Sequence, residues 1–547
     1  MKLVVVAYTL PYQSAHFFNE LVGYQIAARA MGLTHHLIGS STIDSRLAQV
    51  LSAERVLDPL PLTPGVDVEH MVERLIAFAD APRKLESLWA SLEAQNLTDN
   101  DIILFPVGSP ILISGIGSWL AGRPAKRRPG VFFRILETGH ESRTAILFRI
   151  ACANLRTHSG QERVFLVADN RHLAAVVSRI CARRTFVMPV SKYLGAADPS
   201  GFSKEPADPT VYVHLNRRSH ALVKDLANII RCITAAVPGV RFIIKPTKTM
   251  PIEAQETLNS QIASLAEILP EEQQADDYLA NFSKCTVVLL AYEPQAYAIM
   301  TSGVFVEAAS FGKPVVVPGG TWMARQIIEG RGAGTIFEEP DAQTVVAAVL
   351  EALRSAEHLG AIARSLAPQV ANQNSCRVYV EKILLLNRRK PDMEPRYEIG
   401  EEINFSDAFD SRCFMGDGWG ETETWGVWTI GRTAEVILNL SAEIEGSLLF
   451  KAFVHPFLGP THRQLVIHIS ADGQEIAQWS FGIDPLGANE PEWREATIPP
   501  YRRDDRRSPL TLLFTIDAPS SPLAEGISND SRALGLGLRK LSLHAVS

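Results

Sequence analysis

The alternation of short apolar runs with longer amphipathic segments constrains the fold of this chain more than any other feature. Over residues 1–390 these short runs are apolar along their whole length, and the segments between them have helical periodicity. Strands of this kind are typical of parallel sheets that helices cover on both faces. The pattern therefore predicts an α/β architecture with parallel sheets.

The apolar runs form two series, which predict two Rossmann-like domains at residues 1–195 and 209–390. The first series places strands at 3–8, 35–38, 101–106, 131–136, 163–167 and 186–190. The second places strands at 211–215, 241–245, 286–291, 314–317 and 334–337. Residues 195–209 are polar and rich in Pro, Gly, Ser and Asp, as expected of an interdomain linker.

The pattern changes after residue 400, where helical periodicity disappears. Short alternating segments separated by turn residues predict an all-β sandwich or jelly roll at 400–547. The expected strands are 434–440, 447–453, 465–470, 475–481, 495–498, 510–516 and 536–544. The fold class is therefore two Rossmann-like domains followed by a β-sandwich.

Tryptophans gather in this last region, at Trp419, Trp425, Trp428, Trp479 and Trp493. Indole rings on a β-sandwich can stack on sugars and form a carbohydrate-binding surface. They can equally serve core or rim packing, and the sequence leaves both interpretations open.

Charge and cysteine content narrow the class of protein. The formal net charge of -7 argues against a general nucleic-acid binder, which carries a dominant basic face. Six cysteines are spread singly, which suggests neither a zinc site nor a disulfide framework and fits a reducing, cytoplasmic location. No apolar stretch reaches the roughly 18 residues of a membrane-spanning helix. Basic clusters at 123–128, 388–390 and 502–507 are either solvated surface or a docking patch for anionic lipid.

The most informative segment is 302–317, SGVFVEAASFGKPVVV, which joins an expected helix to an expected strand. Ser302 and Gly303 open the helix, where free backbone N–H groups and the positive end of the helix dipole favour an anion. Glu307 follows about one and a half turns later and can accept hydrogen bonds from sugar hydroxyls. The alternative is that Glu307 is a solvated helix residue and Gly312 only a helix stop.

This segment resembles the donor-binding segment of group 1 (family 4) retaining glycosyltransferases. Ser302, Gly303, Glu307, Ala308 and the run 312–316 match the second half of that family's motif. The resemblance covers roughly residues 209–386. It implies the GT-B fold of two Rossmann-like domains and retaining sugar transfer from a UDP- or GDP-sugar, with neither a metal nor another cofactor.

By the same resemblance, Glu307 binds the donor ribose, and the backbone at Ser302 and Gly303 meets the sugar or the diphosphate. The pattern departs from the family at Ile299, eight positions before Glu307, where the family has a first glutamate. Candidates to serve the donor in another way are Tyr292, Tyr297 and Ser302.

Basic residues after the strands of the second domain are candidates to stabilise the departing diphosphate. They are Arg217, Arg218, Lys224 and Lys245. Cations placed there would oppose the negative charge that develops on the leaving group, and two such cations would make a metal unnecessary. Solvent-facing capping roles for Arg217, Arg218 and Lys245 are the alternative.

Three residues of the first domain are further candidates. His140 follows the strand at 131–136, where similar enzymes bring a histidine to the transferring sugar. His16 and Asn19 follow the first strand and are candidates for the acceptor site. Carboxyl ends of parallel strands are where open α/β sheets bind ligands.

The β region resembles an uncharacterised domain appended to bacterial polysaccharide glycosyltransferases, with Trp425 and Trp428 early and Leu534-Gly535 near its last strand. The function expected is sugar transfer to a glycan or lipid-linked acceptor in surface-polysaccharide synthesis, in the cytoplasm or peripherally at the inner membrane. A nucleotide-sugar 2-epimerase and a non-catalytic GT-B-fold protein that binds or scaffolds glycans are the alternatives.

Overall fold

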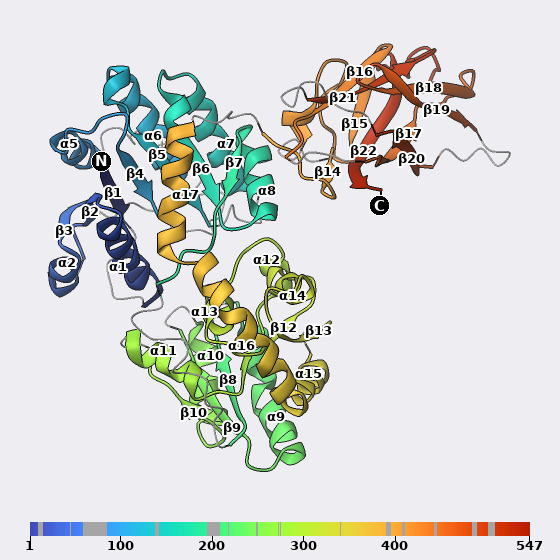
Figure 1. The fold of residues 1–547 in the computed structure, drawn as a ribbon. Coiled ribbons are helices and arrows are strands. Elements are labelled where there is room, and N and C mark those ends of the chain that lie inside the picture. Colours follow the sequence, from blue (N-terminus) through green and yellow to red (C-terminus); the bar gives the residue numbers. More distant parts are fainter. Residues whose placement is uncertain are drawn as a thin grey trace. The chain divides into compact units, whose positions relative to one another are not determined.

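The structure is a computed structural model (Figure 1). It describes residues 1–547 except 9–14, 44, 58–84, 137–141, 194–207, 217, 248–249, 272, 274, 340, 390–394, 407–410, 442–445, 484–489, 501–508 and 547. The predicted fold class is confirmed: two parallel-sheet α/β domains precede an antiparallel β region.

The first domain is built on a seven-stranded sheet in the order β3-β2-β1-β4-β5-β6-β7. Its strands are β1 (Lys2–Ala7), β2 (Thr34–Ser40), β3 (Ala53–Leu57), β4 (Ile102–Phe105), β5 (Gly130–Ile135), β6 (Val164–Ala168) and β7 (Thr185–Val187). The sequence prediction missed only β3, AERVL, which lies at the sheet edge with its first four residues partly or fully exposed. Because an edge strand is half-solvated, it lacks the continuous apolar run that marks the buried strands.

The helices that belong to this sheet alternate with its strands along the chain. They are α1 (Ala15–Ala30), α2 (Ser45–Leu51), α5 (Glu86–Ala94), α6 (Pro110–Ala121), α7 (Ser142–Arg156) and α8 (Arg171–Cys181). Ser109 caps α6, accepting a hydrogen bond from the Leu112 N–H, and Pro110 occupies its first turn. Both features are those expected at the start of a helix.

The second domain has a six-stranded sheet in the order β10-β9-β8-β11-β12-β13. Its strands are β8 (Thr210–His214), β9 (Arg241–Lys245), β10 (Glu267–Ile268), β11 (Val287–Leu289), β12 (Val315–Pro318) and β13 (Gly334–Phe337). Its helices are α9 (His220–Ala236), α10 (Ile252–Thr257), α11 (Ala275–Ser283), α12 (Pro294–Tyr297), α13 (Gly303–Ser310), α14 (Trp322–Ile328) and α15 (Ala342–Arg354). Two buried clusters of apolar side chains fill this domain. Only the two-residue edge strand β10 was not predicted.

Two long helices follow the second sheet and lead the chain back to the first domain (Figure 1). In the second domain, α16 (Ala356–Gln373) packs on α13, and α17 (Cys376–Arg389) packs on α1 of the first domain. The rings of Tyr24 and Tyr379 meet across the α1–α17 contact at 5.6 Å between centroids.

The β region is a sandwich of two antiparallel sheets. Its strands are β14 (Glu402–Asn404), β15 (Val427–Ile430), β16 (Thr433–Leu438), β17 (Leu448–Pro456), β18 (Gln464–Ala471), β19 (Gln474–Gly482), β20 (Glu492–Ile498), β21 (Leu510–Ile516) and β22 (Leu534–Ala545). One sheet runs β14-β22-β17-β20, with β15 also on β22, and the other runs β16-β21-β18-β19. Side chains from both sheets form one core, so the predicted sandwich is confirmed.

By its internal contacts the chain divides into two compact units. The first comprises Met1–Glu141, Asn154–Leu173 and Phe186–Pro391, and therefore holds both parallel sheets. The second comprises Ser142–Ala153, Ala174–Thr185 and Asp392–Ser547. Parts of α7 and α8 thus group with the sandwich.

Candidate functional site

The start of α13 lies beyond the carboxyl end of β11 in the second sheet. Ser302 adopts an extended conformation as the cap residue, and its hydroxyl accepts a hydrogen bond from the Phe305 N–H at 3.1 Å. A polar cap of this kind stabilises the first turn and orients the remaining N–H groups along the helix axis. The predicted helix opening at Ser302 and Gly303 therefore has the local geometry that suits an anion.

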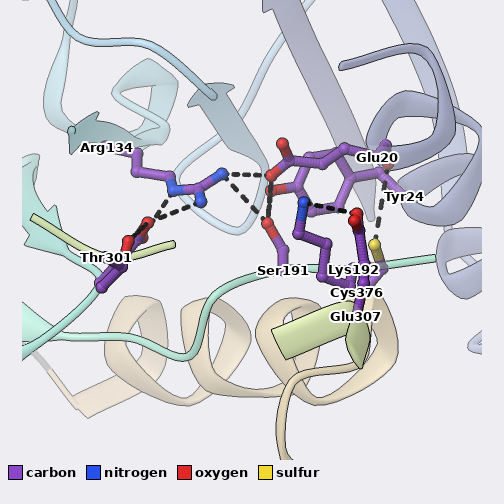
Figure 2. Close-up of polar contacts among 9 residues, drawn as sticks. Glu20, Tyr24, Arg134, Ser191, Lys192, Thr301, Glu307 and Cys376 are labelled. Atoms are coloured by element: carbon purple, nitrogen blue, oxygen red, sulfur yellow. Dashed lines mark hydrogen bonds and ion pairs between the residues drawn. The ribbon is translucent and has the colours of Figure 1, made fainter. Parts of the chain in front are cut away.

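Glu307 is buried on α13 and makes two strong interactions there, of which Figure 2 shows the pair with Lys192. Its Oε1 accepts from the Lys192 ammonium at 3.0 Å, and its Oε2 accepts from the Tyr278 hydroxyl at 2.7 Å. Burial and the charge of Glu307 raise the pKa of Tyr278, so this phenol stays a donor. The carboxylate is therefore not the solvated helix residue of the simpler interpretation.

Lys192 was not predicted from the sequence, although its ammonium pairs with Glu307 of the motif. Its backbone is fixed by hydrogen bonds, because its N–H donates to Asn374 and its carbonyl accepts from Cys376. The side chain then crosses Gly303, where an added Cβ would lie 2.8 Å from the lysine Cε. Glycine at position 303 thus gives Lys192 the room to reach Glu307.

Two of the predicted residues of the second domain, Arg218 and Tyr297, lie in neighbouring segments beside α13. Asn216, just after β8, donates to the Tyr297 hydroxyl at 3.1 Å, and the Tyr297 ring packs 4.6 Å from that of Tyr292. Arg218 donates to the Met300 sulfur at 2.7 Å. The structure thus brings Arg218 and Tyr297 to the same end of the sheet as the motif at 302–307.

Two predicted cations have other surroundings. The buried Lys245 ammonium donates to the carbonyls of Pro246, Pro270 and Glu271 at 3.1, 3.0 and 2.6 Å. Burial lowers its pKa. Each of the three ammonium N–H groups of Lys245 thus donates to a backbone carbonyl. These hydrogen bonds hold together the loops that follow β9 and β10. Lys224 is exposed on α9.

The remaining predicted residues are described only in part. His140 and Arg217 lie outside the described residues, as does the side chain of His16, whose backbone belongs to α1. Asn19 is half-buried on the same helix.

A buried network of charged groups lies beside the motif, at the carboxyl ends of β5 and β6 (Figure 2). Arg134 forms a bidentate pair with Asp169, from Nε at 2.6 Å and from Nη2 at 2.7 Å. Its Nη1 donates to Glu20 and, at 3.1 Å, to the Ser191 hydroxyl. Burial disfavours the charged guanidinium, but the two carboxylates outweigh it and raise the pKa of Arg134.

This network also holds the loop that leads into α13. The Thr301 hydroxyl donates to Asp169 at 3.2 Å, and the Asn170 amide donates to the Ile299 carbonyl at 2.7 Å. The backbone of Ile299 makes this contact, at the position where the resembling family has a glutamate. The loop before the motif is therefore fixed by residues of the first sheet.

A signal for this network was present in the sequence. Arg134 interrupts the apolar run Val131-Phe132-Phe133, and a charge within a buried strand requires an opposite charge. Asp169 follows the next strand in the same way. To predict that Arg134 and Asp169 lie together, one must also know that β5 and β6 are neighbours in the sheet. An apolar pattern does not specify the order of strands.

The described residues contain no group of three His, Cys, Asp or Glu side chains arranged to hold a metal ion. None of the helices in the described ranges combines the length and apolar composition that crossing a bilayer requires.

Neither the models of protein families nor the sequences of curated proteins match this chain. Its structure is similar to that of the N-terminal domain of trehalose-6-phosphate phosphatase from Candida albicans, with a TM-score of 0.50 and 11% identity over 71% of this chain and 97% of that one. For HepE from Anabaena in complex with UDP, the TM-score is 0.47 at 14% identity, and the match covers 70% of this chain and 98% of HepE. For the spinosyn forosaminyltransferase SpnP, the TM-score is 0.42 at 16% identity, and the match covers 71% of this chain and 100% of SpnP. At 11% identity, the likeness to the Candida albicans domain shows the two-domain GT-B fold alone.

Proposed function

We propose that this chain is a glycosyltransferase that moves a sugar from a nucleotide-sugar donor to a glycan or lipid-linked acceptor. The observation that carries the proposal is the start of α13. A capped helix opening and a buried, ion-paired Glu307 lie together at the carboxyl end of a parallel sheet. They occupy the segment that resembles the donor-binding motif of family 4 retaining glycosyltransferases.

In this proposal the first turn of α13 faces the diphosphate, and Lys192 and Arg218 supply positive charge. Negative charge accumulates on the diphosphate as its bond to the sugar breaks, and fixed dipoles and cations stabilise that charge. Glu307 uses one lone pair of each oxygen for Lys192 and Tyr278. By the resemblance to the family's donor-binding motif, Glu307 also accepts hydrogen bonds from the ribose hydroxyls of the donor.

The finer parts of the proposal come from the sequence resemblance. They are retention of configuration, independence of metal, an approach of His140 to the transferring sugar, and an acceptor site that includes His16 and Asn19. The same resemblance suggests bacterial surface-polysaccharide synthesis in the cytoplasm or at the inner membrane. Metal independence predicts equal turnover with and without a chelator.

A non-catalytic scaffolding protein is the second candidate, because Ile299 stands where the resembling family has its first glutamate. The 2-epimerase alternative would need further carboxylates and histidines beside Glu307. Binding of a nucleotide sugar followed by turnover separates the enzyme from the scaffold.

The test is a thermal-shift and calorimetric titration of the purified chain against UDP, GDP and their sugars. A ligand that binds only the folded state raises the melting temperature by mass action. We expect one nucleotide class to stabilise the protein. Glu307→Ala should lower the affinity for that nucleotide by roughly 10-fold or more, because a hydrogen bond to a charged group is lost. Glu381→Ala, on the exposed face of α17, is the matched control. Absence of stabilisation by every nucleotide would favour the scaffold.

A further inference from the structure

The outer face of the five-stranded sheet of the sandwich carries aromatic side chains. On β17, Phe450, Ala452 and Val454 point into the core, so the alternating residues Phe453 and His455 point outward. Trp428 is outward on β15 and Trp493 on β20, and Trp425 precedes β15. We call Trp425, Trp428, Phe453, His455 and Trp493 the aromatic face.

These rings form a continuous stripe across four neighbouring strands. Trp428 lies 4.6 Å from Trp425 and 5.6 Å from His455 between ring centroids, and Phe453 lies 5.2 Å from Trp493. His455 and Phe453 are two residues apart on β17 and join the two groups. Since β15, β22, β17 and β20 are successive neighbours, the stripe spans about 14 Å of sheet.

Glycine in β22 makes room for the stripe. Gly537 lies in one cross-strand row between Trp428 and His455. A Cβ at position 537 would lie 2.8 Å from Cζ3 of Trp425, so any side chain there would displace this indole. The ring of Trp425 therefore rests directly on the backbone of the sheet.

The aromatic face differs from the tryptophans that serve packing in the same domain. Trp479 is buried in the core, and the Trp419 indole donates to the Glu435 carbonyl at 2.7 Å. Trp493, in contrast, is 48% exposed. Neither Trp428 nor Trp493 uses its indole N–H for a hydrogen bond to any residue in the described ranges. Rings with a solvated face and an unused donor are suited to a ligand.

Charged groups around the stripe are paired with opposite charges. Glu423 accepts from the Trp425 indole at 2.9 Å and pairs with Arg532 at 3.2 Å. Lys451 pairs with Glu495 at 2.6 Å on the same outer face. A face whose charges cancel does not attract an anionic lipid or a nucleic acid by its field. It offers planar polar groups beside aromatic rings.

We propose that the aromatic face binds a neutral glycan chain, a site separate from the proposed donor site and beyond the proposed transfer. The C–H groups of a sugar ring carry partial positive charge and stack on the negative face of an indole. Trp428 and Trp493 supply these faces, and Glu423 and Arg532 exchange hydrogen bonds with the hydroxyls. Two stacking positions along one stripe fit a chain of several sugars better than a single monosaccharide.

The test is binding of the full-length protein to an array of neutral and anionic oligosaccharides, printed without nucleotides. We expect capture by at least one neutral glycan. Trp428→Ala and Trp493→Ala, which lie on different strands, should each weaken it at least 10-fold. Ile430→Ala is the matched control, because Ile430 is exposed on β15 and shares the outward face with Trp428. It should bind as the wild type does.

Other outcomes overturn the proposal. The proposal is wrong if no neutral glycan captures the protein, or if both folded tryptophan variants bind glycan as the wild type does. It is also wrong if the protein prefers vesicles rich in phosphatidylserine, or if it forms a dimer that Trp428→Ala dissociates. Circular dichroism confirms that the variants fold. Because the array contains no nucleotide, failure of the donor proposal would leave this result intact, and the tryptophan variants should keep the nucleotide-induced thermal shift.

Discussion

At the scale of single residues, the Lys192–Glu307 pair is the most consequential contact in the candidate site. The two side chains are 12% and 6% exposed, so each charge depends on the other for compensation. Removing one partner of such a pair is costly because the other charge stays buried, whereas replacing both by uncharged groups often costs little. The pair can therefore be recognised by comparing single and double variants.

We predict that Glu307→Gln destabilises the protein by about 3 kcal/mol, because Lys192 keeps its charge without a counter-ion. The double variant Lys192→Met with Glu307→Gln should recover at least about 1 kcal/mol of this loss. Calorimetric melting of the four proteins of this cycle measures both values. Glu381→Gln, in the exposed pair with Arg377, should change stability by less than about 0.5 kcal/mol. Additive effects of the two substitutions would contradict the coupling.

His35 gives a pH prediction on β2. Burial lowers its pKa from 6.5 to about 4, and its Nε2 has no hydrogen-bond partner among the described residues. Since the folded protein holds this imidazole neutral, its contribution to stability is complete above pH 6.5 and is lost as the pH falls toward 4. The loss amounts to about 3 kcal/mol at most.

His35→Leu should therefore flatten the decline of the melting temperature between pH 6.5 and 4, compared with the wild type. Thr34→Ala, at an exposed position of the same strand, should leave the decline unchanged. Parallel profiles for wild type and His35→Leu would show that this histidine titrates normally in the folded state.

At the scale of elements, α13 combines a sequence motif with a tertiary contact at its first residue. Gly303→Ala places a methyl group against the end of the Lys192 side chain, which is flexible and can move aside. We expect the helix to remain folded, and the Lys192–Glu307 pair to be displaced. We expect nucleotide affinity, measured by calorimetric titration, to fall in Gly303→Ala and to fall by a similar factor in Lys192→Met. Wild-type affinity in Gly303→Ala would mean that the position of Lys192 is irrelevant to binding.

The elements also show how far the sequence could be interpreted. Buried strands such as β5 and β12 were predicted because burial on both faces leaves an apolar run in the sequence. The edge strands β3 and β10 were missed, because half-solvated strands lack that run. Ser302 and Glu307 were identified by a local motif. Lys192 was not, because its place beside Gly303 depends on backbone pairing with residues 374–376, far along the chain.

At the scale of the whole molecule, the sandwich does not form its compact unit alone. The segments Ser142–Ala153 and Ala174–Thr185, from α7 and α8, group with Asp392–Ser547. Within this unit Arg179 and Glu401 form an ion pair at 3.0 Å, with side chains 9% and 11% exposed. The polypeptide of the first domain therefore contributes structure to the third.

This arrangement predicts that the chain tolerates loss of the sandwich poorly. A truncation after Pro391 removes Glu401 and separates the α7 and α8 segments from the rest of their compact unit. We expect it to melt several degrees below the first transition of the full chain and to aggregate, because uncovered apolar surface promotes association. Glu401→Gln in the full chain isolates the ion pair and should cost about 3 kcal/mol. A truncated protein that melts as the full chain does, and that stays monomeric, would instead show that the α7 and α8 segments are stable without the sandwich.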